Sequence, residues 1–186
     1  GLPVDDQTLL QQRPVLVKIA NWPQGLRPAA GLNQADLVFE YYIGAQTNHF
    51  LAVYHGQNSE QVGPLAPARM VDARLSEHYQ GILAYASADN TVEMVLSEVL
   101  PGRSFVRGFT PCPAMCNLTD AGGENTYVNT GAMRELYQAE NPDGDNVNLS
   151  GLDFASHLSE WDAEALQLSY LYADFSVMQW DYDPQS

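Results

Sequence analysis

The chain has 186 residues, of which 45% are hydrophobic and 17% are charged, and this is enough apolar material for one compact core of ordinary domain size. Twenty-three Asp and Glu residues against eight Lys and Arg residues give a formal net charge of −15, so the long-range electrostatic field repels polyphosphates and anionic lipid headgroups. The composition therefore argues against nucleic acid as a partner. No apolar run approaches the roughly 20 residues of a membrane-spanning helix.

Strand and helix patterns alternate along the chain. β-Branched and aromatic runs predict strands at residues 14–20, 36–43, 49–55, 82–87, 104–109, 168–172 and 175–180. Apolar residues at helical spacing predict helices at residues 70–80, 91–100 and 132–139, and Asn90 with Glu93 resembles a capping box at the second of these. The order predicts an α/β (α+β) fold, in which a mixed β-sheet with an antiparallel hairpin carries helices packed on it.

The charge is distributed unevenly. Residues 1–134 contain twelve acidic residues and all eight basic ones, whereas residues 135–186 contain eleven acidic residues and no Lys or Arg. Two interpretations stay open for this last quarter: a solvated, self-repelling surface or tail, and a face for cations or a basic partner. The acidic run at residues 141–148 departs from a calcium-binding EF-hand loop and is interpreted as a turn.

Cys112 and Cys116 are the two cysteines, and three residues separate them. Closing so small a ring would add about 2 kcal/mol of stability in the chain-entropy model. A disulfide is favoured over free thiols, and it indicates an oxidising compartment. The spacing is one residue longer than in redox-active C-x-x-C motifs, and no second ligand pair for zinc is present, so neither a metal nor another cofactor is expected.

The common phosphate-binding, nucleophile and zinc-protease motifs are missing from the sequence. The densest group of polar residues surrounds the predicted hairpin and the Gly-Pro loop that opens a helix, and the candidate ligand-binding residues there are Glu40, Asn48, His49, Arg69 and Asp72. Such a mixture can perform general acid–base chemistry or clamp a carboxylate. In the alternative interpretation, Glu40 and His49 face solvent and Arg69 pairs with a nearby acid. No catalytic residue is identified.

Four ordered motifs, at residues 1–6, 13–21, 27–40 and 62–69, resemble the YerB-like family of bacterial lipoproteins, a domain of unknown function. The resemblance covers residues 1–140 continuously and the last twenty residues more loosely. It divides the chain into an N-terminal α/β domain at residues 1–160 and the beginning of a truncated, β-rich C-terminal domain at residues 161–186. The loop of Cys112 and Cys116 resembles a paired-cysteine loop of one family branch.

Membership of this family implies an extracytoplasmic protein that is attached to the membrane only through a lipid anchor, with the signal segment and anchoring cysteine upstream of Gly1. It implies no known reaction. This chain departs from the family pattern in two loops: the hairpin connection at residues 44–49 lacks the usual acidic residue and arginine, and the loop at residues 63–69 keeps only its second arginine. If those charges form a site, it is depleted here, and Glu40 and Arg69 are what remains.

Two functions follow as hypotheses. The first is a non-catalytic module of the cell envelope that binds a cell-wall component or an envelope protein. The alternative is an enzyme that acts on cell-wall polymer, with Glu40 or Asp72 as general acid or base and Arg69 holding an anionic substrate. We expect the Arg69 guanidinium to bind a carboxylate with two hydrogen bonds, either that of Glu40 or Asp72 or that of a ligand.

Overall fold

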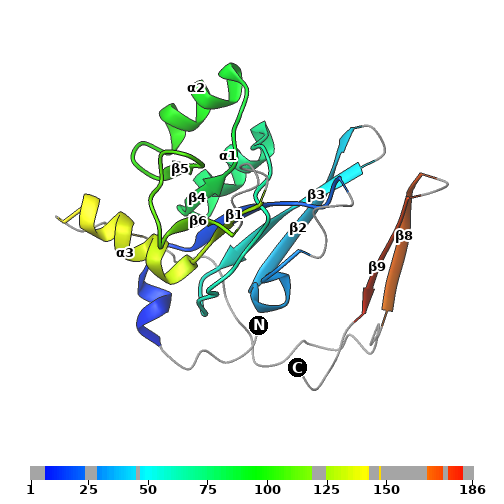
Figure 1. Ribbon diagram of the computed structural model, residues 1–186, viewed down its shortest axis with the longest axis horizontal. Coiled ribbons are helices and arrows are strands. Elements are labelled where there is room, and N and C mark those ends of the chain that lie inside the picture. Colours follow the sequence, from blue (N-terminus) through cyan, green and yellow to red (C-terminus); the bar gives the residue numbers. More distant parts are fainter. Residues whose placement is uncertain are drawn as a thin grey trace.

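A computed structural model describes residues 7–23, 29–44, 47–118, 125–142, 147, 167–173 and 176–181. Its centre is a five-stranded mixed sheet in the order β2-β3-β1-β4-β5 (Figure 1). Strands β2, β3 and β1 pair antiparallel, while β1, β4 and β5 pair parallel. The strands are β1 (Val15–Ala20), β2 (Leu37–Gly44), β3 (Thr47–Tyr54), β4 (Ile82–Tyr85) and β5 (Ser104–Val106).

Helices cover both faces of this sheet. The helices are α1 (Met70–His78), α2 (Asn90–Val99) and α3 (Thr130–Glu140). One apolar cluster joins α1 and α2 to the face that carries Leu16 and Leu83, and a second cluster joins α3 to the face that carries Val17 and Ala84. The predicted α/β fold, with its mixed sheet and antiparallel hairpin, is thereby confirmed.

The remaining strands lie outside this sheet. Strands β6 (Met115–Asn117) and β7 (Thr126–Val128) form an antiparallel pair that the sequence patterns do not predict, and β8 (Gln167–Ala173) pairs with β9 (Ser176–Asp181). Among the described residues, short 3₁₀ helices occupy Gln7–Gln11 and Leu32–Gln34. A disulfide joins Cys112 to Cys116, as predicted.

Helix boundaries differ from the sequence-based expectation in two places. Asp89 rather than Asn90 caps α2, because the Asp89 carboxylate accepts hydrogen bonds from the backbone N–H groups of Thr91 and Val92. Helix α3 begins at Thr130, where the Asn129 side chain accepts from the N–H of Ala132. Most of the acidic run at residues 141–148, and the expected domain boundary at residues 160–161, lie outside the described residues, so those interpretations stay predictions.

The segment from Val62 to Ala68, which we call the connector, binds several elements together. Its backbone pairs with Val128 of β7, with Ala20 and Lys18 of β1, and with Ala86 and Ser87 after β4. A Cβ atom at Gly63 would lie 3.0 Å from the carbonyl oxygen of Thr126, so only glycine fits without a shift. The connector therefore crosses the sheet where the parallel strands end, and it delivers the chain to the start of α1.

Candidate functional site

The five candidate residues lie on both faces of the sheet. Asn48 and His49 are neighbours in β3, and successive side chains of a strand point to opposite faces. Asn48 shares its face with Glu40, whose side chain accepts a hydrogen bond from the Asn48 amide. The side-chain oxygen Oδ1 of Asn48 accepts in turn from the side-chain Nδ2 of Asn21 at 2.8 Å. Glu40 and Asn48 therefore belong to the α3 side of the sheet, and they do not meet His49 and Asp72.

On the α1 side, Lys18, Tyr41 and Asp72 form a buried polar network. Lys18 of β1 and Asp72 of α1 are both fully buried, with the Lys18 Nζ atom 3.5 Å from Asp72 Oδ2. The Tyr41 hydroxyl accepts from Lys18 and donates to the Asp72 carboxylate. Asp72 Oδ2 also accepts from the backbone N–H of Arg69 at 2.7 Å, which caps the first turn of α1.

Burial sets the protonation behaviour of this network. Desolvation lowers the pKa of Lys18 to about 8, although the Asp72 charge opposes the shift. The pKa of Asp72 is raised by the same desolvation, which the Lys18 charge and the Tyr41 hydrogen bond oppose. Each group keeps a partner for its charge or its hydrogen bond, and none of the three side chains has a buried polar atom without a partner.

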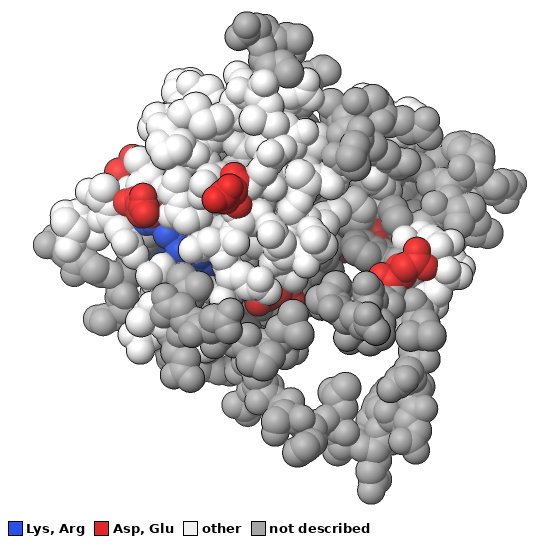
Figure 2. Space-filling model, turned by 60° about the horizontal axis from the view of Figure 1, so that its bottom comes forward, with Lys and Arg blue, Asp and Glu red and all other residues white. Residues whose placement is uncertain are grey.

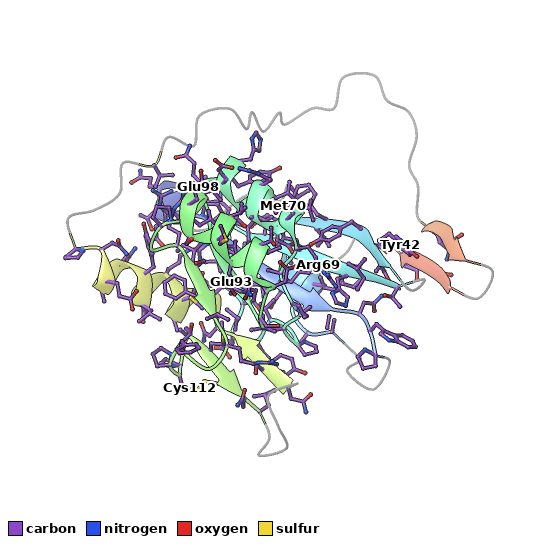
Figure 3. All side chains as sticks on the ribbon, turned by 90° about the horizontal axis from the view of Figure 1, so that it is seen from above. Tyr42, Arg69, Met70, Glu93, Glu98 and Cys112 are labelled. Atoms are coloured by element: carbon purple, nitrogen blue, oxygen red, sulfur yellow. A yellow bond between two sulfur atoms is a disulfide. The ribbon has the colours of Figure 1, made fainter. Side chains whose placement is uncertain are left out.

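Arg69 does not form the internal ion pair that is one of its two expected pairings. Its side chain is exposed, and it forms no ion pair with any described residue. The carboxylate of Asp72 pairs with Lys18 instead, while Arg69 contributes only its backbone N–H. Figure 3 shows Arg69 at the beginning of α1, beside the sheet. The internal two-pronged arginine–carboxylate pair is therefore wrong, and the guanidinium stays at the surface.

A pocket of about 200 Å³ lies where the three parallel strands end. In open α/β sheets this carboxyl edge is where ligands usually bind. The residues that end or follow the parallel strands line it together with His49 of β3 and two residues of the connector; in full, they are Ala20, Trp22, Pro23, His49, Leu65, Pro67, Ala86 and Arg107. Within this lining Arg107 is the charged residue, and no acidic residue is present.

His49 is the buried polar residue of this pocket. It lies between Ala20 of β1 and Tyr41 of β2 in the strand register, and it is 5% exposed. Its Nδ1 atom has no hydrogen-bond partner among the described residues. The pKa of His49 is lowered to about 4, first by burial and then by the positive charges of Lys18 and Arg69, while a hydrogen bond with the Trp22 backbone opposes the shift. At neutral pH the ring is therefore uncharged, and it offers one unused polar atom.

A second pocket, of about 300 Å³, lies at the opposite edge of the sheet, where β1 and β4 begin. Its lining includes Arg13 and Arg134. Arg134 is buried, and its guanidinium donates hydrogen bonds to the backbone of the same chain. Nη2 donates to the Tyr54 carbonyl at 2.7 Å, and Nε donates to the Arg13 carbonyl at 3.3 Å. Arg134 therefore ties α3 to the sheet, and this pocket lacks the unpaired buried atom of the first.

The described residues provide no metal-binding group that competes with the His49 pocket. Figure 2 shows one face of the molecule, on which the acidic side chains of described residues lie apart from one another. Within the described ranges, no group of three His, Cys, Asp or Glu residues could hold a metal ion. In the same part of the chain, no helix has the length and apolar character needed to cross a membrane.

Comparison with known proteins defines the class. A family model described as "Protein of unknown function (DUF3048) N-terminal domain" matches residues 1–142, so the chain belongs to this family. Over 80 residues it is 36% identical to "Putative lipoprotein YerB" of Bacillus subtilis (strain 168), an alignment that covers 43% of this chain and 24% of that protein. The resemblance inferred from the sequence motifs is confirmed.

The solved structure of the YerB protein from Bacillus subtilis has a similar fold. The TM-score is 0.64 at 24% sequence identity, and the match covers 76% of this chain and 48% of that one. The chain thus spans about half of the solved relative and a quarter of the curated one in these alignments. At this identity the structural match shows the fold, and it assigns no activity.

Sequence reasoning missed Lys18, Tyr41, Trp22 and Arg107. Lys18 could have been found, because a lysine inside the apolar run of β1 must be buried and paired. Trp22 carries a weaker signal, because it follows a predicted strand by one residue and the carboxyl ends of parallel strands meet at one edge. Arg107 lies inside the strand predicted at residues 104–109, and only the observed end of β5 at Val106 places it at this edge.

Proposed function

We propose that the chain is a non-catalytic binding module of the cell envelope, and that its ligand occupies the pocket around His49. The observation that carries this proposal is the unpaired, buried Nδ1 atom of His49 at the carboxyl edge of the parallel strands. The relative named as a lipoprotein supports an extracytoplasmic location with a lipid anchor. Because a protein in that location is surrounded by cell-wall material, we propose a cell-wall component as the ligand.

The energetic reason lies in the cost of an unsatisfied polar group. Leaving a buried donor or acceptor without a partner costs about 1–3 kcal/mol. Native proteins keep few such groups, and those that remain call for an explanation such as a ligand. A ligand that forms a hydrogen bond with Nδ1 removes this cost, and the free energy gained favours binding. A wholly apolar pocket would offer no such gain.

The acid–base alternative receives less support from the geometry. Asp72 is fully buried and is already bonded to Lys18, Tyr41 and the backbone of Arg69. Glu40 lies on the other face of the sheet and is bonded to Asn48. Neither carboxylate lines the His49 pocket, so a substrate held there would meet neither proposed acid or base.

The proposal can be tested by titrating the chain with a soluble digest of bacterial cell wall while the imidazole signals of its four histidines are followed by NMR. We expect the His49 signals to shift, and we expect His49→Phe or Trp22→Ala to weaken binding at least tenfold. His78→Phe on the exposed end of α1 is the matched control and should bind as the unmodified chain does. No shift of His49, or unchanged affinity in both pocket variants, would overturn the proposal.

A further inference from the structure

The chemistry of the same pocket allows its ligand to be described more closely, and this inference rests on the proposed function. We infer that the His49 pocket binds an acidic sugar unit: a single ring that presents a carboxylate or phosphate group to Arg107, a hydroxyl group to His49 and an apolar ring face to Trp22. Each part of this description follows from a different property of the lining.

The size of the pocket limits the ligand to a small unit. Its volume of about 200 Å³ is below the roughly 300–1,000 Å³ of pockets that enclose a drug-sized ligand. A pocket this small, open at the edge of a sheet, encloses one ring or one terminal group. A longer polymer could present such a unit while the rest of it stays outside.

The sign of the local charge favours an anion, although the whole chain is strongly acidic. Arg107 lines the pocket, and the Arg69 guanidinium lies near enough to affect the His49 ring. Asp72 pairs with Lys18, so the positive side chains left to attract an anion at this edge are those of Arg107 and Arg69. No described acidic residue lines the pocket to oppose an anion.

The remaining lining suits a ring that is apolar on its faces and polar at its rim. Trp22 is 50% exposed, and Pro23 and Pro67 lie in the same lining. Flat, rigid side chains of this kind pack against a ring face at a low cost in conformational entropy. The His49 ring is uncharged at neutral pH, so Nδ1 can exchange a hydrogen bond with a hydroxyl group. A sugar ring offers both of these features beside its acidic group.

Matched pairs of ligands test the inference on the full chain. N-acetylmuramic acid and N-acetylglucosamine differ by a carboxylate-bearing group, and glucose 6-phosphate and glucose differ by a phosphate. We expect at least one acidic sugar to shift the His49 imidazole signals and to bind at least tenfold more tightly than its neutral counterpart. The preference should shrink as salt is raised, because salt screens the attraction of the exposed Arg69 charge for the anion. The two pairs also tell a carboxylate from a phosphate.

Variants separate the role of the charge from that of the pocket. Arg107→Gln should reduce the preference for the acidic sugar to less than threefold, while Arg74→Gln on the exposed side of α1 should leave it unchanged. Equal binding of acidic and neutral sugars, an unchanged preference in Arg107→Gln, or no shift of His49 with any of the four sugars would overturn this inference. If one of these results is obtained but the cell-wall digest still shifts the His49 signals, the acidic-sugar inference fails while the proposed function is retained.

Discussion

On the α1 side of the sheet, the buried network of Lys18, Tyr41 and Asp72 differs from the nearby His49 in how its hydrogen bonds are completed. Lys18, Tyr41 and Asp72 bind one another, and Asp72 also accepts from the backbone at the start of α1. His49 lies close by in the adjacent strand, yet its Nδ1 atom has no partner among the described residues.

The difference separates a structural role from a binding role. A complete buried network fixes the position of an element and has no atom left for a ligand. A buried polar atom without a partner lowers the stability of the folded chain, and a ligand that bonds to it can restore the lost free energy. In this chain the candidate acid Asp72 belongs to the first kind and His49 to the second, although the sequence patterns place both in one candidate site.

The largest expected effect is that of Asp72→Ala. Removing this carboxylate leaves the buried Lys18 ammonium without its ion-pair partner and uncaps the Arg69 N–H, so the free energy of unfolding at pH 7 should fall by about 3–5 kcal/mol. Denaturant-induced unfolding followed by circular dichroism measures this loss. Glu77→Ala, which removes an exposed pair with Arg74, should change it by less than about 1 kcal/mol. A loss below about 1 kcal/mol for Asp72→Ala would contradict the structural role.

Tyr41→Phe tests the middle of the same network. It removes the hydroxyl that accepts from Lys18 and donates to Asp72 but keeps the ring that packs under the ammonium. The free energy of unfolding should therefore fall by about 1–3 kcal/mol, the cost of leaving charged groups less well bonded. Tyr42→Phe, at an exposed position of the same strand, is the control. Equal effects of the two substitutions would show that the hydroxyl of Tyr41 contributes nothing particular.

The pH dependence of stability tests the burial of His49. Its folded pKa is lowered from 6.5 to about 4, so between these values the unfolded chain takes up a proton that the folded chain does not. Stability should therefore fall as the pH is lowered from about 6.5 toward 4, by about 1–2 kcal/mol between pH 6.5 and pH 5. His49→Phe should lack this part of the pH dependence in parallel unfolding curves. Superimposable curves for the two chains would mean that the ring is accessible to protons.

Arg69→Ala should have the smallest effect on stability. The side chain is exposed and forms no ion pair with a described residue, and the backbone N–H that binds Asp72 remains. The free energy of unfolding should change by no more than about 0.5 kcal/mol. The midpoint of thermal unfolding, compared with that of the unmodified chain, measures this change. If the variant instead loses more than about 1 kcal/mol, Arg69 stabilises the fold through its side chain, and the contrast with Lys18 disappears.

Much of the sheet could be predicted from local patterns. The continuous apolar run of β1 is typical of a strand that is buried on both faces, and the glycine-containing stretch at residues 44–48 is typical of a hairpin. Strands β6 and β7 have three residues each, which is too short for an alternating pattern to emerge. The cap of α2 was misplaced because Asp89 and Asn90 are both good capping residues, and only the backbone conformation decides between them.

The candidate site was harder to predict, because its pairings connect distant parts of the chain. The sequence patterns identify Asp72 and Arg69 as important but cannot show that Lys18 is the partner of Asp72. They also group Asn48 with His49, although adjacent residues of a strand face opposite sides of the sheet. Whether His49 or Asn48 faces the pocket depends on the register of the sheet, and this is a long-range property.

The connector has a consequence for how the protein tolerates change. Loops at a protein surface usually accept insertions and exchange their amide hydrogens quickly. The connector is a loop by its conformation, yet Ala66 and Ala68 donate their amide hydrogens to Lys18 and Ser87. Its amides should therefore exchange as slowly as those of the central strands. A peptide inserted between Val62 and Ala68 would break the hydrogen bonds by which the connector joins β7 to β1 and to the chain after β4, so we expect it to destabilise the protein far more than an insertion in a surface loop.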